Sequence, residues 1–247
     1  MRPLVTAIRT LTLLPIPGKD SANLASALPF FPAIGVLIGA LVVLTLYVAS
    51  LTGWIAGAGV IAMIVAVWIT RGLHVDGLAD VMDALGASRT RERRLEIMKD
   101  PHMGAFGVMA IVGDLLLKTV ALSHLAALSQ WSLALVPFIV SRTAQVFLAT
   151  SLPYARQEGG KAAAFVQEAR HYHLLLALLA AVVFCFAASG LAGLLLLLQG
   201  LIFALFLKFW MHRHFGGVTG DLLGASNEVI ETGLLTFAAF IATAGYG

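Results

Sequence analysis

Long apolar runs restrict the fold of this chain more than any other feature of its sequence. A helix needs about 20 residues to cross the hydrocarbon core of a bilayer, and most of the runs approach or exceed that length. Because a backbone in contact with lipid must satisfy its own hydrogen bonds, each run is predicted to be a transmembrane helix. The predicted spans are residues 30–51, 54–71, 104–126, 131–150, 173–189, 191–211 and 222–246.

The composition supports a membrane protein. Hydrophobic residues make up 60% of the chain and charged residues 12%, whereas soluble domains carry about 25% charged residues. Ten-residue stretches of alternating polarity are absent, which disfavours a β-barrel. The single cysteine, Cys185, excludes a disulfide within the chain and a cysteine metal site. We therefore expect an all-α fold: a polytopic membrane helical bundle of about seven transmembrane helices, forming one domain over residues 1–247.

The links between the spans differ in charge. Some are short and uncharged, and the others hold most of the basic residues. The positive-inside rule places the basic links, the N-terminus and the active-site loops in the cytoplasm, which predicts a protein integral to a bacterial or archaeal cytoplasmic (inner) membrane. We interpret the first basic link as an amphipathic segment on the membrane surface, without a cleavable signal. The basic links are residues 1–29, 72–103, 151–172 and 212–221.

An acidic cluster lies near the start of the second basic link. Asp76, Asp80 and Asp83 are spaced i, i+4 and i+7, so on a helix they share one face, and His74 precedes them. Three carboxylates at the edge of a bilayer would be costly without a counter-ion. Carboxylate oxygens are the ligands that Mg²⁺ prefers, and Mg²⁺ commonly binds phosphate. The cluster therefore predicts a magnesium site that handles phosphate.

A second polar stretch follows in the same link. Glu92 and Glu96 lie beside several arginines, and such a stripe is more often a solvated face with ion pairs than a site. Asp100 differs because it lies where the chain re-enters the membrane, and there we favour a functional role. Residues 72–103 together form the predicted acidic and basic active-site segment.

A glycine-rich loop, residues 215–228, is the second candidate site. Its glycines allow close approach of the backbone to a phosphate, and the amides at the start of the following helix favour an anion. Thr219 or Asp221 is a suitable cap for that helix. Acidic residues at the mouth of a span usually face a polar cavity. The candidate residues of this loop and span are Gly217, Thr219, Gly220, Asp221, Asn227 and Glu228.

Three further charges lie inside the predicted spans. Asp114 and Lys118 are spaced i, i+4, which favours a neutralising pair within one helix. Arg142 lies near the middle of its span, where it either pairs with an acid or reaches a phosphate of a ligand.

These motifs resemble the cobalamin synthase family. The likeness covers nearly the whole chain, including a Thr-Leu-Leu-Pro-Ile-Pro stretch near the N-terminus. Members often have Asp-Gly after the acidic motif, where this chain has Asp83-Ala84. The segments that carry the resemblance are His74–Asp83, Arg93–Asp100 with Gly104 and Gly107, and Gly217–Asp221 with Gly224 and Ala225.

The resemblance implies adenosylcobinamide-GDP ribazoletransferase activity. In that reaction α-ribazole, or its 5′-phosphate, attacks adenosylcobinamide-GDP. GMP leaves, and adenosylcobalamin or its 5′-phosphate forms. The resemblance also implies a requirement for Mg²⁺ as cofactor.

We expect the ion to bridge the donor pyrophosphate during in-line attack by the ribose 3′-hydroxyl. The attacking hydroxyl needs a proton acceptor, for which Asp83 and His74 are both candidates. The predicted metal ligands are Asp76, Asp80, Asp83 and Asp100. The predicted phosphate-binding residues are Arg93, Arg94, Arg142, Gly217, Thr219, Gly220 and Asp221.

Two other functions remain open at this point. One is a phospholipid enzyme similar to the CDP-alcohol phosphotransferases, whose aspartate motif is reminiscent of this one but differently spaced. The other is a transporter, although the chain has no internal repeat and its polar clusters lie towards one side. The expected partners are the two substrates and the lipid bilayer. The formal charge of +3 is too small to indicate nucleic acid, whereas small residues such as Gly35 and Gly39 allow a homo-oligomer.

Overall fold

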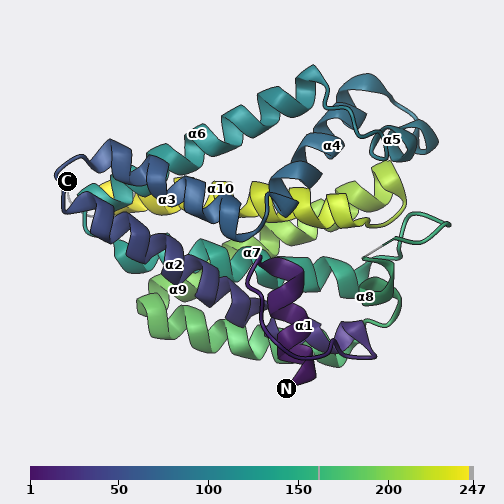
Figure 1. Ribbon diagram of the computed structural model, residues 1–247, viewed down its shortest axis with the longest axis horizontal. Coiled ribbons are helices and arrows are strands. Elements are labelled where there is room, and N and C mark those ends of the chain that lie inside the picture. Colours follow the sequence, from purple (N-terminus) through teal and green to yellow (C-terminus); the bar gives the residue numbers. More distant parts are fainter. Residues whose placement is uncertain (161, 245–247) are drawn as a thin grey trace.

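The computed structural model describes residues 1–160 and 162–244 as a bundle of helices (Figure 1). Within these residues the backbone forms no β-strand, and the all-α prediction is confirmed. The elements in chain order are α1 (Arg2–Leu11), the 3₁₀ helix η1 (Leu24–Phe30), α2 (Phe31–Ser50), α3 (Ile55–Ile69), α4 (Leu73–Ala87), α5 (Arg91–Ile97), α6 (Ala105–Ala127), α7 (Trp131–Ser151), α8 (Ala163–Gln167), α9 (His171–Phe215) and α10 (Gly220–Ala244).

Helices occupy all the predicted spans within the described residues. In the described part of the chain, four helices are long and apolar enough to cross a membrane, or five if α3 and α4 are joined as one bent span. The class of helical membrane protein is therefore confirmed, whereas the count of seven is not.

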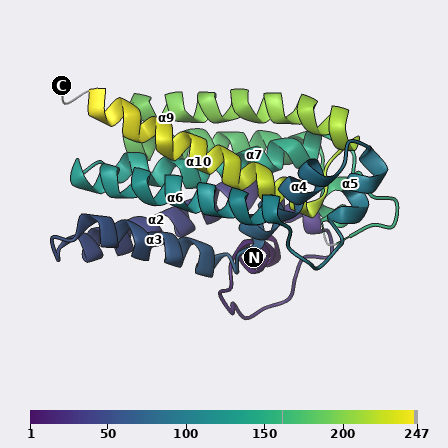
Figure 2. The same cartoon turned by 90° about the horizontal axis from the view of Figure 1, so that it is seen from above.

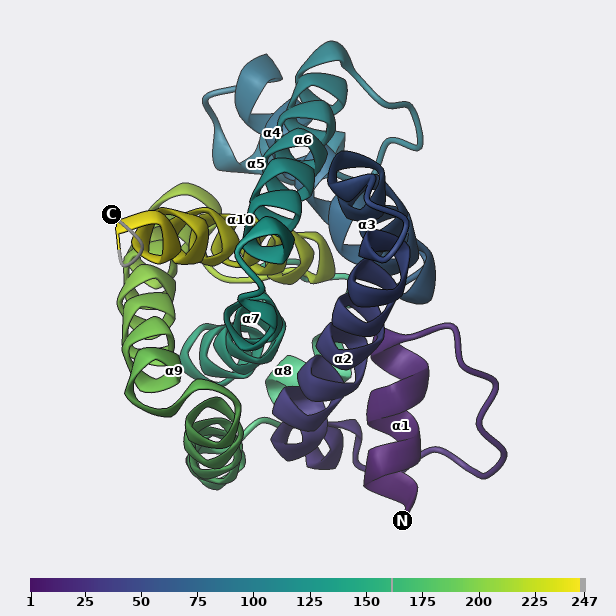
Figure 3. The same ribbon diagram turned by 90° about the vertical axis from the view of Figure 1, so that its left-hand side faces the viewer.

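Helix α9 consists of two arms. Ser189 and Gly190 have non-helical dihedral angles, and the φ of +54° at Gly190 lies in the region that favours glycine. A Cβ added at Gly193 would collide with the carbonyl oxygen of Cys185. In a continuous helix these two residues, eight positions apart, would be separated by about 12 Å along the axis. The chain therefore reverses at Ser189–Gly190, as Figure 3 shows. The arms correspond to the two spans predicted on either side of residue 190.

A sharp bend separates α3 from α4. The two helices are bent by 88°, and the connecting residues Arg71 and Gly72 have φ of +56° and +64°. The Arg71 guanidinium donates a hydrogen bond of 3.0 Å to the carbonyl oxygen of Arg9 in α1. Helix α4 consequently leaves the direction of the long helices and lies with α5 at one end of the bundle (Figure 2). We treat α4 as lying outside the membrane-spanning segments.

Helix α7 lies at the centre of the bundle, between α2, α9 and α10 (Figure 3). Glycines on α2 allow its close contact with α7: a Cβ at Gly35 would collide with the carbonyl oxygen of Phe138, and one at Gly39 would lie 3.1 Å from that of Leu135. Small residues of this kind let helix backbones approach in a membrane. Gly35 and Gly39, whose small size was compatible with a homo-oligomer, therefore serve the packing of helices within the chain.

This contact predicts different effects for two glycine substitutions. We expect Gly35→Ala to destabilise the protein by about 1–3 kcal/mol, because the added methyl group overpacks the interface of α2 and α7. Gly113→Ala is the matched control, since a Cβ at that helical position would have no atom of the described residues within 4 Å. Thermal unfolding in detergent measures both effects. Equal melting temperatures for the two variants would contradict the proposed contact.

Candidate active site at the end of the bundle

The acidic face of α4 lies against the start of α10. A Cβ added at Gly77 would lie 2.6 Å from the carbonyl oxygen of Asp221, and one at Gly224 would lie 3.2 Å from the Cα of His74. Gly77 thus needs to be glycine for the two backbones to touch, and Gly224 leaves little room for a side chain. The contact brings together the two candidate sites that the sequence predicted separately. Asp80 and Asp221 are partly exposed there.

The glycine-rich loop packs against another part of the chain, residues 153–160. The amide of Val218 donates to the carbonyl oxygen of Pro153 at 2.9 Å, and the amide of Ala155 donates to the carbonyl oxygen of Val218 at 2.8 Å. The Thr219 hydroxyl accepts a bond from the amide of Leu222 at 3.2 Å. Thr219 therefore caps α10, which was one of the two caps predicted for this helix.

Arg156 is a site residue that the sequence analysis missed. Its Nη2 donates to Oδ2 of Asp221 at 2.6 Å and to the carbonyl oxygen of Met98 at 3.3 Å. No motif surrounds Arg156, so nothing in the sequence distinguishes it from the other basic residues of its link. It enters the site through the pairing of residues 153–155 with the glycine-rich loop, which is a contact between distant segments.

Burial and the repulsion between neighbouring carboxylates shape the electrostatics of the site. Burial raises the pKa of Asp80 to about 7, with further contributions from the negative charges of Asp76, Asp221 and Asp83. The positive charge of Arg156 acts in the opposite direction. A site of this kind favours a bound cation, because a cation relieves the repulsion that a carboxylate in a like-charged group experiences.

Asp83 holds the start of α6. Its Oδ2 accepts a hydrogen bond of 2.7 Å from the amide of Gly104, and its Oδ1 accepts one of 2.8 Å from the amide of Gly107. A Cβ at Gly107 would come too close to this carboxylate, so glycine is needed there. The negative charge is favourable at the N-terminus of a helix. Ala84 continues α4 without a turn. The metal and proton-acceptor roles of Asp83 stay predictions.

The donor set fits Mg²⁺ only in part. Within residues 1–160 and 162–244, no three histidine, cysteine, aspartate or glutamate side chains form a ready-made metal cage. Mg²⁺ usually keeps several waters and binds one or two carboxylates together with phosphate oxygens, so a complete protein cage is not needed. Partly exposed Asp80 and Asp221, with exposed Asp76, offer carboxylate oxygens of that kind.

Asp100 lies in the exposed link between α5 and α6. The amide of His102 donates to Oδ1 of Asp100 at 2.9 Å, and the His102 ring Nδ1 lies 2.6 Å from the same oxygen. These hydrogen bonds lower the pKa of Asp100. The carboxylate is therefore part of a local turn, and its predicted role as metal ligand stays a prediction.

The two predicted phosphate-binding arginines of α5 have other partners. Arg93 forms an exposed ion pair of 3.0 Å with Glu96, which matches the solvated face expected for that glutamate. Arg94 donates through Nε to the carbonyl oxygen of Ser88 at 2.9 Å and through Nη1 to that of His214 at 3.5 Å. Arg94 thus joins α5 to the end of α9. Phosphate binding by either arginine stays a prediction.

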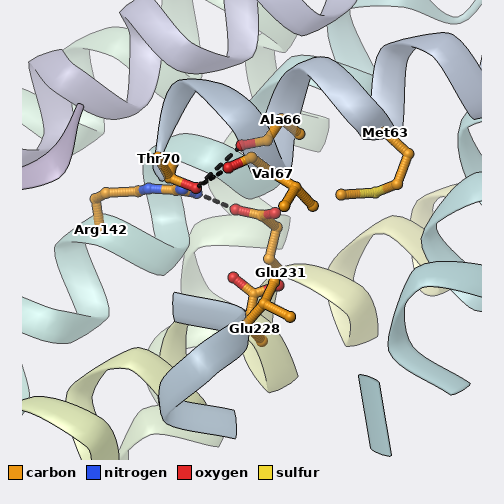
Figure 4. Close-up of a pocket in the computed structure, with 8 residues that line it drawn as sticks. Met63, Ala66, Val67, Thr70, Arg142, Glu228 and Glu231 are labelled. Carbon is orange, nitrogen blue, oxygen red and sulfur yellow. Dashed lines mark hydrogen bonds and ion pairs between the residues drawn. The ribbon is translucent and has the colours of Figure 1, made fainter. Parts of the chain in front are cut away.

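A network of buried charges lies deeper in the bundle. Lys118 of α6 pairs with Asp114 at 3.3 Å, with Glu231 at 3.1 Å and with Glu228. The expected pair within α6 is confirmed, and two glutamates of α10 join it. Arg142 of α7 pairs with Glu231 (Figure 4). Of the two alternatives left open for Arg142, the structure shows the acidic partner.

His74 and Asn227 extend this network towards α4. The Nδ1 of His74 lies 3.9 Å from Oε1 of Glu228, and the side-chain Nδ2 of Asn227 donates to the same oxygen at 3.1 Å. Neither ring nitrogen of His74 has a hydrogen-bond partner among the described residues. His74 is buried, whereas Asp76 is exposed, so the two side chains lie in different environments.

A small cavity opens beside the network. Arg142, Glu228 and Glu231 line it together with Thr70 and apolar residues of α3, and its volume is about 10 Å³ (Figure 4). A cavity of about this size holds roughly one water molecule. Glu228, the acidic residue predicted to face a polar cavity, thus lines one.

Comparison with known proteins identifies close relatives of this chain. Residues 3–239 match the family described as cobalamin-5-phosphate synthase. A protein of Chlorobaculum tepidum is 46% identical over 239 residues, which is 96% of this chain and 94% of the relative. A protein of Syntrophobacter fumaroxidans is 40% identical over 245 residues, which is 95% of this chain and 96% of the relative. Both relatives are named adenosylcobinamide-GDP ribazoletransferase. No solved structure matches the chain.

The buried network predicts a large effect of neutralising Lys118. We expect Lys118→Met to destabilise the protein by about 3–5 kcal/mol, because it leaves buried carboxylates without their partner. The double variant Lys118→Met/Glu228→Gln removes one charge of each sign and should recover part of that loss. Lys208→Met, which removes a partly exposed lysine of α9, is the control. A double variant less stable than Lys118→Met would contradict this assignment.

The cap on α6 predicts a local effect of removing Asp83. We expect Asp83→Ala to destabilise the protein by about 1–2 kcal/mol, the usual loss for a helix cap. Hydrogen exchange should accelerate at the amides of Gly104 and Gly107. Asp76→Ala removes an exposed carboxylate from the same helix and should leave these two amides protected. Unchanged exchange in Asp83→Ala would show that the cap does not form.

Proposed function

The chain belongs to the cobalamin-5-phosphate synthase family, and we propose that the contact of α4 with α10 forms the site of its transfer reaction. The protein is an adenosylcobinamide-GDP ribazoletransferase, which joins adenosylcobinamide-GDP to ribazole. The observation that carries the choice of site is the backbone contact at Gly77, which unites an acidic helix face with a glycine-rich loop.

The reaction is a displacement at phosphorus. The ribose hydroxyl of α-ribazole, or of its 5′-phosphate, forms a bond to the phosphate that remains on cobinamide. The bond between that phosphate and the bridging oxygen breaks, and GMP leaves with the electron pair. The donor pyrophosphate is anionic, so the acidic face of α4 repels it unless a cation intervenes.

We propose Mg²⁺ as that cation. Asp76, Asp80 and Asp221 would hold it, since their oxygens are partly or fully exposed at the site. When bound, the ion would neutralise charge on the pyrophosphate and on the departing GMP. The raised pKa of Asp80, at about 7, supports a position in which an added positive charge is favourable.

Residues of the chain itself would bind the phosphates. The N-terminus of α10 presents backbone amides and the positive end of a helix dipole, which together favour an anion. Arg156 lies beside it and offers a planar guanidinium suited to phosphate. Asp83 is the favoured acceptor for the proton of the attacking hydroxyl, because it is partly exposed whereas His74 is buried.

We place the site on the cytoplasmic side of the inner membrane. The basic links expected there meet at the end of the bundle that bears α4, α5 and α8, and the C-terminal end of α10 lies at the other (Figure 1). The nucleotide-bearing donor would reach this surface from the cytoplasm. The relatives carry the name of the transferase, which favours it over the lipid enzyme and the transporter that the sequence left open.

Purified protein in detergent or bilayers tests this function directly. With adenosylcobinamide-GDP, α-ribazole and Mg²⁺, we expect release of GMP and formation of the corrinoid product, followed by chromatography. Asp80→Asn should slow transfer by about 100-fold or more, as when one electrostatic contact to a transition state is lost. Arg2→Met, at an exposed position of α1 outside the active-site segment, is the control for a surface change.

Two results would contradict this proposal in different ways. Absence of product from the wild-type protein across lipid compositions, with Mg²⁺ or Mn²⁺, would exclude the activity. An unchanged rate in a folded Asp80→Asn variant would remove Asp80 from the metal site while leaving the activity in place.

A further inference from the structure

Arg156 occupies a position in which a cation is needed. Its guanidinium pairs with Asp221 at 2.6 Å, and the two side chains are 15% and 25% exposed. It also opposes the negative charges that act on Asp80. In this structure, therefore, the arginine partly does what a bound metal ion would do, which is to neutralise carboxylates at the junction of α4 and α10.

The hydrogen bonds of Arg156 are incomplete. A guanidinium has five N–H donors, and the Nη2 of Arg156 serves both Asp221 and the carbonyl oxygen of Met98. Its Nε is buried and has no partner among the described residues. A buried donor without a partner is costly, so a ligand oxygen that it can reach would gain a hydrogen bond.

The backbone next to Arg156 is held against the glycine-rich loop. Pro153 and Ala155 bond to Val218 in the glycine-rich loop, and α8 does not begin until Ala163. The backbone at the base of Arg156 is thus fixed beside the start of α10. Its long side chain can still turn from a carboxylate to a phosphate placed nearby, because both lie at the same helix N-terminus.

Charge competition links the arginine to the metal. A divalent ion and a guanidinium that share the carboxylate of Asp221 repel each other, so the ion pair weakens metal binding. A pyrophosphate removes this conflict, since its oxygens offer the guanidinium a bidentate partner. Arrival of the donor would therefore favour release of Asp221 from Arg156. The freed carboxylate of Asp221 would then bind the metal ion.

From these contacts we propose that Arg156 exchanges partners during the reaction. It pairs with Asp221 while the site lacks donor, and it binds the pyrophosphate of adenosylcobinamide-GDP once the donor enters, which frees Asp221 for the metal ion. This inference rests on the proposed function. It makes Arg156 a catalytic residue that touches the substrate, and it makes tight metal binding follow donor binding.

A purely structural role for Arg156 predicts something different. If its pair with Asp221 only joined residues 153–160 to α10, losing it would loosen the site and weaken the binding of metal and donor together. Partner exchange instead predicts opposite changes. Without the arginine, Asp221 is free for the metal, while the pyrophosphate loses its guanidinium.

The test measures the two ligands separately on the full-length protein in detergent. Mn²⁺ alone, followed by electron paramagnetic resonance, reports metal binding without donor, and the KM for adenosylcobinamide-GDP reports on the donor. In Arg156→Met we expect Mn²⁺ to bind several-fold more tightly and this KM to rise about 10-fold or more, as for loss of a charge-assisted hydrogen bond. Arg2→Met, which removes an exposed arginine of α1 outside the active-site segment, should change neither quantity.

Two further variants keep the test decisive. If Arg156→Met does not fold, Arg156→Lys keeps the charge but loses the bidentate fork, and the KM should still rise. Asp221→Asn removes the partner that the exchange requires, so Mn²⁺ binding should fall and should no longer respond to removal of the Arg156 charge.

The outcomes separate this inference from the function on which it rests. No transfer by the wild-type protein would overturn the proposed function. A wild-type protein that is active, together with a folded Arg156 variant that binds Mn²⁺ no more tightly, would overturn the exchange alone. An unchanged KM for the donor in that variant would do the same.

Discussion

The buried charges around Lys118 join three long helices of the bundle, α6, α7 and α10. Charged groups are costly inside a membrane, and they persist there when they pair with one another. Lys118 of α6 and Arg142 of α7 both bind Glu231, so α10 is fixed against two long helices. Because α10 is fixed in this way, its first turn lies against the face of α4 that bears the aspartates.

The site itself is built by backbones that touch. The 88° bend after α3 carries α4 across the end of the bundle, and Gly77 and Gly224 remove the side chains that would keep α4 away from α10. The same device holds α6, where Gly107 leaves room for the carboxylate of Asp83. At Gly77, Gly107 and Gly224 the lack of a side chain thus allows close approach of segments of the chain, while phosphate binding by Gly217 and Gly220 stays a prediction.

Charge balance connects this architecture to the proposed chemistry. The carboxylates near Asp80 repel one another, and Arg156 relieves part of that repulsion. A transfer between a pyrophosphate and a hydroxyl requires positive charge at the same place. Because Arg156 already lies there, it can give up its pair with a carboxylate of the chain and bind the substrate instead. The exposed end of the bundle is suited to this role because water and soluble nucleotide can reach it.

Features that depend only on neighbouring residues could be predicted from the sequence alone. Apolar runs placed the helices, the i, i+4, i+7 spacing placed the aspartates on one face of α4, and local motifs indicated the family. Tertiary structure decided which distant groups meet: Arg142 with Glu231, Asp83 with the start of α6, and Arg156 with Asp221. Periodicity and hydropathy are encoded within about 20 residues of one helix. A partner from another helix is chosen by packing and bends, which no single segment specifies.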